Sequence, residues 1–363
     1  MTVPAAFGPA QPGPAAREPL RARRLGLDTQ DEAVAVMRQD CPVCRAEGFT
    51  AHSRVALEAN GRTAFATLYP IASDLLAPGE VGLSEAAWNH LALADGAAVT
   101  VRHPPPLESL AHVRAKIYGQ VLPEPALRAV MADIVAGRYD SIALAAFVTA
   151  VATRPLDTGE TIALTRAMVA VGDRLSWPQP VIVDKHCVGG LPGNRTTPLV
   201  VAICAAAGLV MPKTSSRAIT SPAGTADAME TMAPVDLGLD RMRQVVEREG
   251  GCVVWGGAVG LSPADDRLIR VERALDLDNE AQLVASVMSK KVAAGATHLV
   301  LDIPVGPTAK VRGAEAAARL EGALLAVAEA FGVRAAVVLS DGTQPVGRGI
   351  GPAPEARDVL AVL

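Results

Sequence analysis

The stretch DKHCVGGLPGNRTT, residues 184–197, decides the fold of this chain. The apolar run PVIVD (180–184) before it predicts a buried strand, and TTPLVVAICAAAGL (196–209) after it predicts a helix. A Gly-rich turn between a strand and a helix leaves backbone N–H groups and the positive end of the helix dipole available to an anion. Its lysine adds a positive charge and its threonines add hydroxyls. We therefore expect a phosphate site here, with a turn that serves packing alone as the open alternative. The spacing fits neither GxxxxGK[ST] nor GxGxxG.

The same strand–helix alternation continues downstream. THLVLDIPV (297–305) reads as a strand, AEAAARLEGALLAVAEAFG (314–332) as a helix and VRAAVVLSD (333–341) as a further strand. Such alternation favours a parallel sheet covered by helices on both faces. We expect an α/β domain over residues 177–363 that binds phosphate.

The upstream part has a different texture. Residues 105–176 carry apolar residues three and four apart, which predicts a helical bundle. Residues 23–104 contain Asn60-Gly61 between two alternating apolar runs, the signature of a hairpin, and predict a small β-rich domain. Residues 1–22, rich in Pro, Ala and Gly, read as a flexible tail.

Composition limits the partners. The chain has 363 residues with 34 basic and 38 acidic side chains, a net charge of −4, which argues against a nucleic-acid binder. Aromatic residues make up only 3%, too few for base-stacking platforms. No apolar run approaches the ~18 residues of a membrane span. Five cysteines in a chain of this length favour a reducing cytoplasm over a disulfide framework.

A second polar cluster, PKTSSRAITSPAGTAD (212–227), is too polar for a core strand. Its hydroxyls suit a phosphate or a sugar, and the fork of Arg217 matches phosphate oxygens. A Ser/Thr-rich surface loop is the alternative interpretation.

These two blocks, followed by LVASVMSKK (283–291) and PVGPTAK (304–310), resemble the thymidine/pyrimidine-nucleoside phosphorylase family. The match is closest to its type 2 branch, which is similar to AMP phosphorylases. The resemblance implies a homodimer that joins a helical domain to an α/β domain. It also implies reversible phosphorolysis, in which phosphate displaces a pyrimidine base from a (deoxy)ribose. The family continues into a C-terminal α+β part beyond EARDVLAVL (355–363), so we expect that part to be absent here.

The resemblance also assigns residues. It implies phosphate contacts for Lys185, Cys187, Thr197, Ser215 and Thr225. It implies nucleoside contacts for Gly190, Ser216, Arg217, Ala218, Ile219, Thr220, Ser221, Ser286, Lys290 and Lys310. The catalytic set it implies is Asp278, Lys185 and His186, with Asp278 as proton donor. Many relatives carry serine where this chain has Cys187, and a thiol is the weaker donor. Asp278 also fits a helix N-cap.

Phosphorolysis needs no cofactor and no metal, because inorganic phosphate is itself a substrate. Thymidine is the first expected substrate, and AMP, which would give ribose 1,5-bisphosphate, is the alternative. A phosphoribosyltransferase would need acidic pairs for Mg²⁺, for which Asp265-Asp266 is the candidate. A non-catalytic protein that binds a phosphorylated ligand is the interpretation from another class.

Two remaining groups predict structure rather than chemistry. Cys41 and Cys44 lack the second pair of ligands that a zinc site needs, so we expect a turn with two reduced thiols. The charged run from Asp265 to Arg273 has mixed sign and predicts a solvated or interface ion network.

Overall fold

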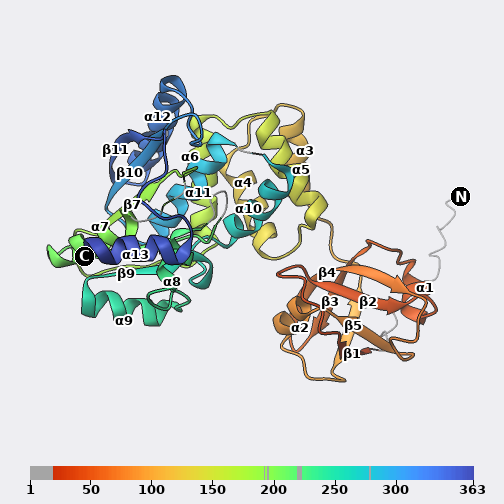
Figure 1. Ribbon diagram of the computed structural model, residues 1–363. Helices are drawn as coiled ribbons and strands as arrows, with labels where there is room; N and C mark the ends of the chain where they lie inside the picture. Colours follow the sequence, from red (N-terminus) through yellow and green to blue (C-terminus); the bar gives the residue numbers. More distant parts are fainter. Residues whose placement is uncertain (1–18, 192, 194–195, 219–222, 278) are drawn as a thin grey trace, which may run out of the picture. The chain divides into compact units, whose positions relative to one another are not determined.

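The computed structural model describes residues 19–191, 193, 196–218, 223–277 and 279–363. The chain forms two compact units, Met1–Leu107 and Glu108–Leu363, which are drawn from red to blue along the sequence in Figure 1.

The first unit is a closed six-stranded barrel with strand order β1-β5-β2-β4-β3-β6. Its strands are β1 (Leu20–Arg24), β2 (Val34–Arg38), β3 (Arg54–Ala59), β4 (Arg62–Ile71), β5 (Glu80–Leu83) and β6 (Ala98–Arg102). Two short helices, α1 (Pro42–Glu47) and α2 (Glu85–Leu91), lie between strands. The predicted hairpin is confirmed, because β3 pairs antiparallel with β4 across Asn60 and Gly61. Both turn residues have positive φ, +52° and +70°.

The second unit begins with the helices expected between residues 105 and 176. They are α3 (Leu110–Ile117), α4 (Glu124–Val135), α5 (Ser141–Thr153) and α6 (Thr158–Ala170). Asp157 caps α6 by accepting the backbone N–H of Glu160 at 2.7 Å. The buried Glu160 carboxylate also binds Lys116 of α3 at 2.8 Å, which ties these two helices together.

Two later helices, α10 (Pro263–Leu275) and α11 (Glu280–Ala293), pack on this bundle. α11 contacts α6 on one side and α12 (Ala314–Ala330) on the other, so it joins the bundle to the sheet region (Figure 1). No helix of the described chain combines the length and the apolar character that crossing a membrane requires.

The sheet of the second unit is parallel throughout. Its strands are β7 (Val183–Cys187), β8 (Met211–Ser215), β9 (Gly251–Trp255), β10 (His298–Val305) and β11 (Arg334–Asp341). β7 and β11 flank β10, β8 pairs with β9, and one bridge from Ile182 to Val210 connects the two parts. The remaining helices of this region are α7 (Thr196–Ala206), α8 (Thr225–Glu230), α9 (Leu239–Glu249) and α13 (Pro352–Val362), with a 3₁₀ turn at Gly256–Ala258.

The strand order across this sheet is therefore β9-β8-β7-β10-β11. The chain runs outward from β7 to β9 and then returns to place β10 on the other side of β7. Ligands of open α/β sheets bind at the carboxyl ends of the strands beside such a reversal. The loops that follow β7 and β10 are therefore the expected position of a ligand site.

Three expectations differ from the structure. The expected flexible tail extends to residue 22, but Leu20–Arg24 forms β1, because Leu20 and Ala22 are buried in the barrel. The strand expected at 180–184 is instead Val183–Cys187, and part of the cluster expected to be too polar for a core strand forms β8. Lys213 and Thr214 of β8 are each only 4% exposed. Asp184 of β7 has a charged partner on α11, because Lys291 lies 3.0 Å from its carboxylate.

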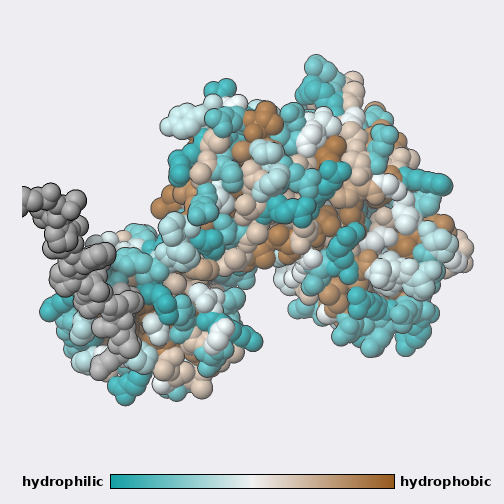
Figure 2. Space-filling model, turned by 180° about the vertical axis from the view of Figure 1, so that it is seen from behind, coloured by the Kyte–Doolittle hydropathy of each residue, from teal (hydrophilic) through white to brown (hydrophobic). Residues whose placement is uncertain are grey.

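Apolar packing holds both units. The barrel core includes Val55, Leu57 and Leu68, and the sheet packs on α11 and α12 through Leu301, Met288 and Leu324. Figure 2 shows that apolar side chains also reach the surface of the second unit among the polar ones.

Candidate active site

The loop after β7 carries the first group of predicted site residues. Lys185 is 7% exposed, and its Nζ donates to the Thr196 hydroxyl at 3.1 Å. Thr196 and the buried Thr197 are the first two residues of α7, so the ammonium lies at the positive end of that helix. A carboxylate oxygen of Asp302 on β10 lies 3.9 Å from the same Nζ. A helix N-terminus beside a buried ammonium is the environment that a phosphate dianion requires.

More positive charge lies behind this loop. Lys213 on β8 is buried, and its Nζ donates to the Thr214 carbonyl. Lys291 is 2% exposed and forms an ion pair with Asp184. The Asp184 carboxylate is therefore the salt-bridge partner of Lys291 rather than of Lys213. Burial, and then the charge of Lys291, lower the pKa of Lys213 well below the ordinary lysine value.

His186 follows Lys185 on β7 and belongs to this electropositive region. Burial lowers its pKa well below the ordinary histidine value, and the charges of nearby lysines (Lys291, Lys213, Lys185 and Lys290) lower it further. The imidazole is therefore neutral at neutral pH. It can form hydrogen bonds, but it does not carry the extra proton that a general acid transfers.

Cys187 is the last residue of β7 and lies opposite Asp302 of β10 in the sheet register. Burial raises the pKa of its thiol to about 11, so the thiol is protonated at neutral pH. The Asp302 carboxylate also accepts the Ser340 hydroxyl at 2.5 Å, which links β10 to β11 beneath the loop.

The second polar cluster, residues 212–227, includes most of β8 and the start of α8, and β8 lies next to β7. The Ser215 hydroxyl donates to the Val254 carbonyl at 3.1 Å, and Thr225 opens α8. The carbonyl of Ser216 accepts the backbone N–H of Ala226 at 3.1 Å, which fixes the segment after β8 against α8. Gly224 makes this possible, because a Cβ there would lie 2.4 Å from the backbone of Arg217.

Arg217 itself is occupied by protein partners. Its guanidinium binds Asp227 at 3.1 Å and Glu230 at 2.6 Å, and it lies 5.0 Å from the ring centroid of Trp255. The hydrogen bonds that Arg217 donates to Glu230 are the main cause of its raised pKa. Asp227 also accepts the Ala218 amide at 2.8 Å. The predicted ligand contact of Arg217 therefore has two carboxylates as competitors.

The third group lies on α11. Lys290 Nζ is 2.5 Å from an oxygen of Asp265, and the Ser286 hydroxyl donates to the same oxygen at 2.9 Å. Although burial alone would lower it, the pKa of Lys290 is raised by Asp265. Of the solvated or interface ion network expected here, the solvated alternative is wrong for Asp265, which is 1% exposed and paired with Lys290 of α11.

Gly190 and Lys310 come from the two loops at the strand reversal. Gly190 has φ +93°, and a Cβ on it would lie 2.3 Å from the backbone nitrogen of Lys310. The structure thus brings these two predicted nucleoside-binding positions into contact.

Four predicted residues, Asp278, Ile219, Thr220 and Ser221, lie outside the described residues. The N-cap of α11, a role that the sequence left open for Asp278, belongs to Asn279, whose side chain accepts the Gln282 amide at 3.2 Å. The residues predicted for the site did not include Asp184, Lys213, Lys291 or Asp302. A charged residue inside an otherwise apolar strand run, as in LVMPKTS, was the available signal.

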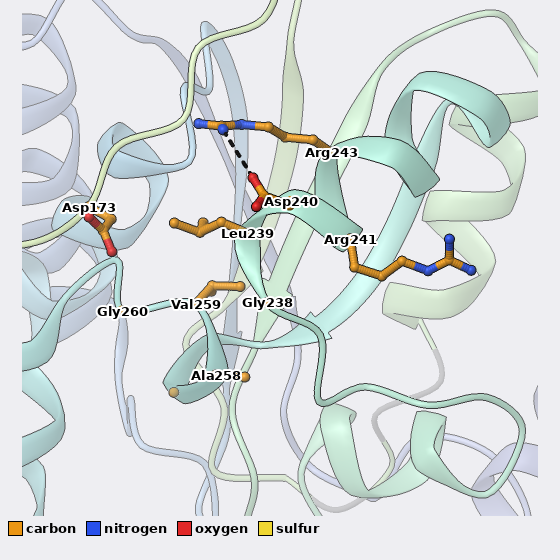
Figure 3. Close-up of a pocket in the computed structure, with 10 residues that line it drawn as sticks. Asp173, Gly238, Leu239, Asp240, Arg241, Arg243, Ala258, Val259 and Gly260 are labelled. Atoms are coloured by element: carbon orange, nitrogen blue, oxygen red, sulfur yellow. Dashed lines mark ion pairs between the residues drawn. The ribbon is translucent and has the colours of Figure 1, made fainter. Parts of the chain in front are cut away.

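A cavity in the second unit lies apart from these residues. It measures about 710 Å³ and is lined by the start of α9, the turn at Gly257–Gly260 and Asp173 (Figure 3). Arg243 lies 3.7 Å from Asp240 at its wall and points toward it, whereas Arg241 points away (Figure 3). None of the predicted site residues lines this cavity. The converging lysines therefore define the candidate site better than the cavity does.

Within the described part of the chain, no three His, Cys, Asp or Glu side chains gather closely enough to hold a metal ion. Cys41 and Cys44 are buried free thiols beside α1, as expected, although Cys44 lies in a helix rather than in a turn.

Two family descriptions match the second unit. "Glycosyl transferase family, helical bundle domain" matches residues 111–172, and "Glycosyl transferase family, a/b domain" matches residues 179–357. The solved anthranilate phosphoribosyltransferase of Thermus thermophilus has a similar fold, with a TM-score of 0.55 and 22% identity over 69% of this chain and 80% of that one. The fold and the two matching family descriptions define a glycosyltransferase.

Curated relatives narrow the class. "Putative thymidine phosphorylase" of Parvibaculum lavamentivorans is 64% identical over 344 residues, which cover 95% of this chain and 68% of that protein. The protein of the same name from Chelativorans sp. is 62% identical over 357 residues, covering 98% of this chain and 69% of its own. The chain belongs to the thymidine/pyrimidine-nucleoside phosphorylase family and is a pentosyltransferase.

Proposed function

We propose that the chain catalyses the reversible phosphorolysis of a pyrimidine nucleoside, with thymidine and phosphate giving thymine and 2-deoxyribose 1-phosphate. The observation that carries this proposal is the buried Lys185 ammonium at the N-terminus of α7. It offers a desolvated positive charge and helix amides to one small dianion. The names of the curated relatives agree with this reaction.

The reaction has two electrostatic demands. An oxygen of phosphate forms the new C1′–O bond while the C1′–N bond breaks and its electron pair leaves with the base. The sugar then carries positive charge, which the bound phosphate dianion stabilises. We assign Lys185, Thr197, Ser215 and Thr225 to hold the phosphate, with Cys187 as a weaker donor.

The departing base carries the negative charge, so it needs donors. Lys290 is suited to this role because Asp265 raises its pKa and keeps it an ammonium. His186 is neutral and would contribute a hydrogen bond only. We therefore propose Asp278, the family's proton donor, as the group that protonates the base. Gly190 and Lys310 would close the sugar side, together with the segment from Ser216 to Ser221.

AMP is the competing substrate within this family. A 5′-phosphate would call on Arg217, whose guanidinium already binds Asp227 and Glu230. This commitment favours a nucleoside over a nucleotide. The phosphoribosyltransferase interpretation loses its Mg²⁺ pair, because Asp265 is buried against Lys290. The non-catalytic interpretation is set aside by membership of an enzyme family.

One assay separates the substrates. Thymine release from thymidine, and adenine release from AMP, are measured with and without inorganic phosphate. We expect phosphate-dependent release of thymine, and release that does not require phosphate would refute phosphorolysis. Lys185→Ala should lower kcat/KM for phosphate by ~10²-fold, the usual loss on removing one preorganised charge contact. Wild-type turnover by this variant would show that the phosphate site is assigned wrongly.

We also infer a homodimer that requires no cofactor and binds neither nucleic acid nor membranes. Apolar side chains exposed around α3 and the start of α5 support a second copy as the partner: Ile117, Tyr118, Val121 and Ile142. Five free cysteines agree with a cytoplasmic protein. Light scattering of the wild type and of Tyr118→Lys tests the dimer, which the added charge should dissociate.

A further inference from the structure

Asp265 brings two predicted nucleoside-binding residues together from behind. Its Oδ2 atom accepts the Ser286 hydroxyl at 2.9 Å and lies 2.5 Å from Lys290 Nζ. Ser286 and Lys290 are four residues apart in α11 and therefore share one face of that helix. One carboxylate oxygen of α10 thus organises two side chains of α11.

Burial separates the roles of the three groups. The Asp265 side chain is 1% exposed, whereas that of Lys290 is 24% exposed and Ser286 is half-buried. The carboxylate is the inner member, and the two groups that a ligand can reach are the outer ones. A carboxylate this deeply buried is stable only because the ammonium and the hydroxyl compensate its lost hydration.

The hydrogen bond also fixes what Ser286 can offer. Its single hydroxyl proton is donated to Asp265, so the oxygen faces a ligand as an acceptor. Lys290 retains further N–H donors. The pair therefore presents one acceptor and one donor side by side, which matches the N–H and C=O groups that adjoin each other on a nucleobase edge.

We propose that Asp265 is a positioning residue, which holds Lys290 and Ser286 in the orientation that binds the nucleobase as it leaves. This proposal rests on the proposed phosphorolysis, because it assigns a supporting residue to the base side of the same site. Asp265 does not touch the substrate and acts through its two partners.

Asp265→Asn tests the proposal by removing the charge and keeping the shape. We expect kcat/KM for the nucleoside to fall by ~10- to 100-fold, the scale of a misplaced binding group, with KM for phosphate unchanged. Without the carboxylate, burial lowers the pKa of Lys290, so the alkaline limb of kcat/KM should move below the ordinary lysine value of about 10.4. Asp266→Asn is the matched control with the same charge change one residue away, and it should have the smaller effect on both quantities.

A double-mutant cycle separates positioning from a merely structural role. In a Lys290→Met background, Asp265→Asn should lower kcat/KM by a smaller factor than it does in the wild type, because one of the two residues through which it acts is gone. An equal loss in both backgrounds, or an alkaline limb that stays in place, would overturn the proposal. Asp265→Glu keeps the charge but displaces the carboxylate oxygen. It should therefore retain the position of the alkaline limb of kcat/KM and lower kcat.

A measurement without substrate makes the two proposals distinguishable. The lysines are methylated with ¹³C-formaldehyde, and the Lys290 signal is titrated by NMR in the wild type and in Asp265→Asn. We expect the Lys290 pKa to be lower in the variant, and equal titration curves would refute the coupling even if the enzyme were active. Absence of phosphorolysis together with a shifted Lys290 would instead refute the proposed function. If Asp265→Asn does not fold, Asp265→Glu is used instead: a lower kcat/KM with an unshifted Lys290 titration supports the proposal, and a wild-type kcat/KM would overturn it.

Discussion

Gly190 lies directly against the backbone of Lys310: a Cβ on Gly190 would be 2.3 Å from the Lys310 nitrogen and 2.9 Å from the Ala309 carbonyl carbon. The loop that follows β7 and the loop that follows β10 therefore meet backbone to backbone. Both loops lie at the strand reversal of the sheet, and each carries predicted ligand contacts.

The two adjacent glycines of this loop make a matched experiment. Gly189 and Gly190 have φ values of +90° and +93°, but of the two only Gly190 has atoms within 4 Å of its missing Cβ. Both Ala variants should lose about 1–2 kcal/mol of stability from the left-handed backbone. Gly190→Ala should also lower kcat/KM by ~10-fold or more by displacing Lys310. Equal activity of the two variants would show that this contact does not matter for function.

Lys213 and Lys291 should respond to truncation with opposite signs. Among the described residues, Lys213 is buried without a carboxylate of its own, so Lys213→Met should raise the free energy of unfolding at pH 7 by about 1–3 kcal/mol. Lys291→Met leaves Asp184 buried and unpaired and should lower it by about 3–5 kcal/mol. Urea unfolding followed through Trp177 and Trp255, in a Trp88→Phe background, measures both.

The gain from Lys213→Met should depend on pH. The folded-state pKa of Lys213 is lowered, so below about pH 10.4 the unfolded chain binds more protons than the native one. Wild-type stability therefore rises with pH toward that value, and the advantage of the variant should shrink between pH 7 and pH 9.5. A constant advantage would mean that Lys213 is charged in the folded protein.

His186 should not produce a titration in the activity profile near pH 6.5. Its folded-state pKa is lowered well below that value, so the site contains neutral imidazole throughout pH 6–8. His186→Asn should therefore give a kcat/KM profile of the same shape over this range. An acid limb present in the wild type and lost in the variant would contradict this.

The same shift affects stability at low pH. Below about pH 6.5 this histidine is protonated in the unfolded chain but stays neutral in the folded protein. The free energy of unfolding therefore falls as pH drops, and His186 contributes at most about 1.4 kcal/mol per pH unit to this fall. His186→Asn should flatten that part of the curve. Urea denaturation between pH 5 and 7 provides the measurement.

Cys187→Ser should improve phosphate binding. Burial raises the thiol pKa to about 11, so the wild type offers a weak S–H donor. A hydroxyl should gain about 1 kcal/mol, a roughly 5-fold lower KM for phosphate. Cys204→Ser on α7 is the control and should leave KM unchanged. No gain at Cys187 would place phosphate elsewhere.

Apolar periodicity and turn chemistry predicted most of the elements. The Asn60-Gly61 hairpin and the strand and helix pair at 298–330 both follow from spacing that local physics enforces. The parts of β7 and β8 that contain Lys185 and Lys213 could not be predicted from the sequence. A polar residue predicts a loop unless its buried partner is known. Lys185 contacts Thr196 of α7 and Asp302 of β10, and its neighbour Asp184 pairs with Lys291 of α11, so these contacts depend on elements distant in the sequence.

The candidate site shows the same limit. Lys185 and Gly190 could be predicted because their chemistry lies in one local motif. Asp265 could not be assigned its place, since its meaning depends on Ser286 and Lys290 across a helix–helix contact. Arg217 is the opposite case. Its side chain is suited to bind phosphate, but in the structure it forms hydrogen bonds to Asp227 and Glu230, which lie close to it in the sequence.

The pairing of β7 with β10 joins segments 115 residues apart, while α3 to α6 are built from neighbours in the chain. Closing so long a loop is slow compared with forming local helices. During renaturation, helical circular dichroism should consequently recover before turnover does. We therefore expect the strand pairing that brings Lys185 near Asp302 to form later in folding than the helices.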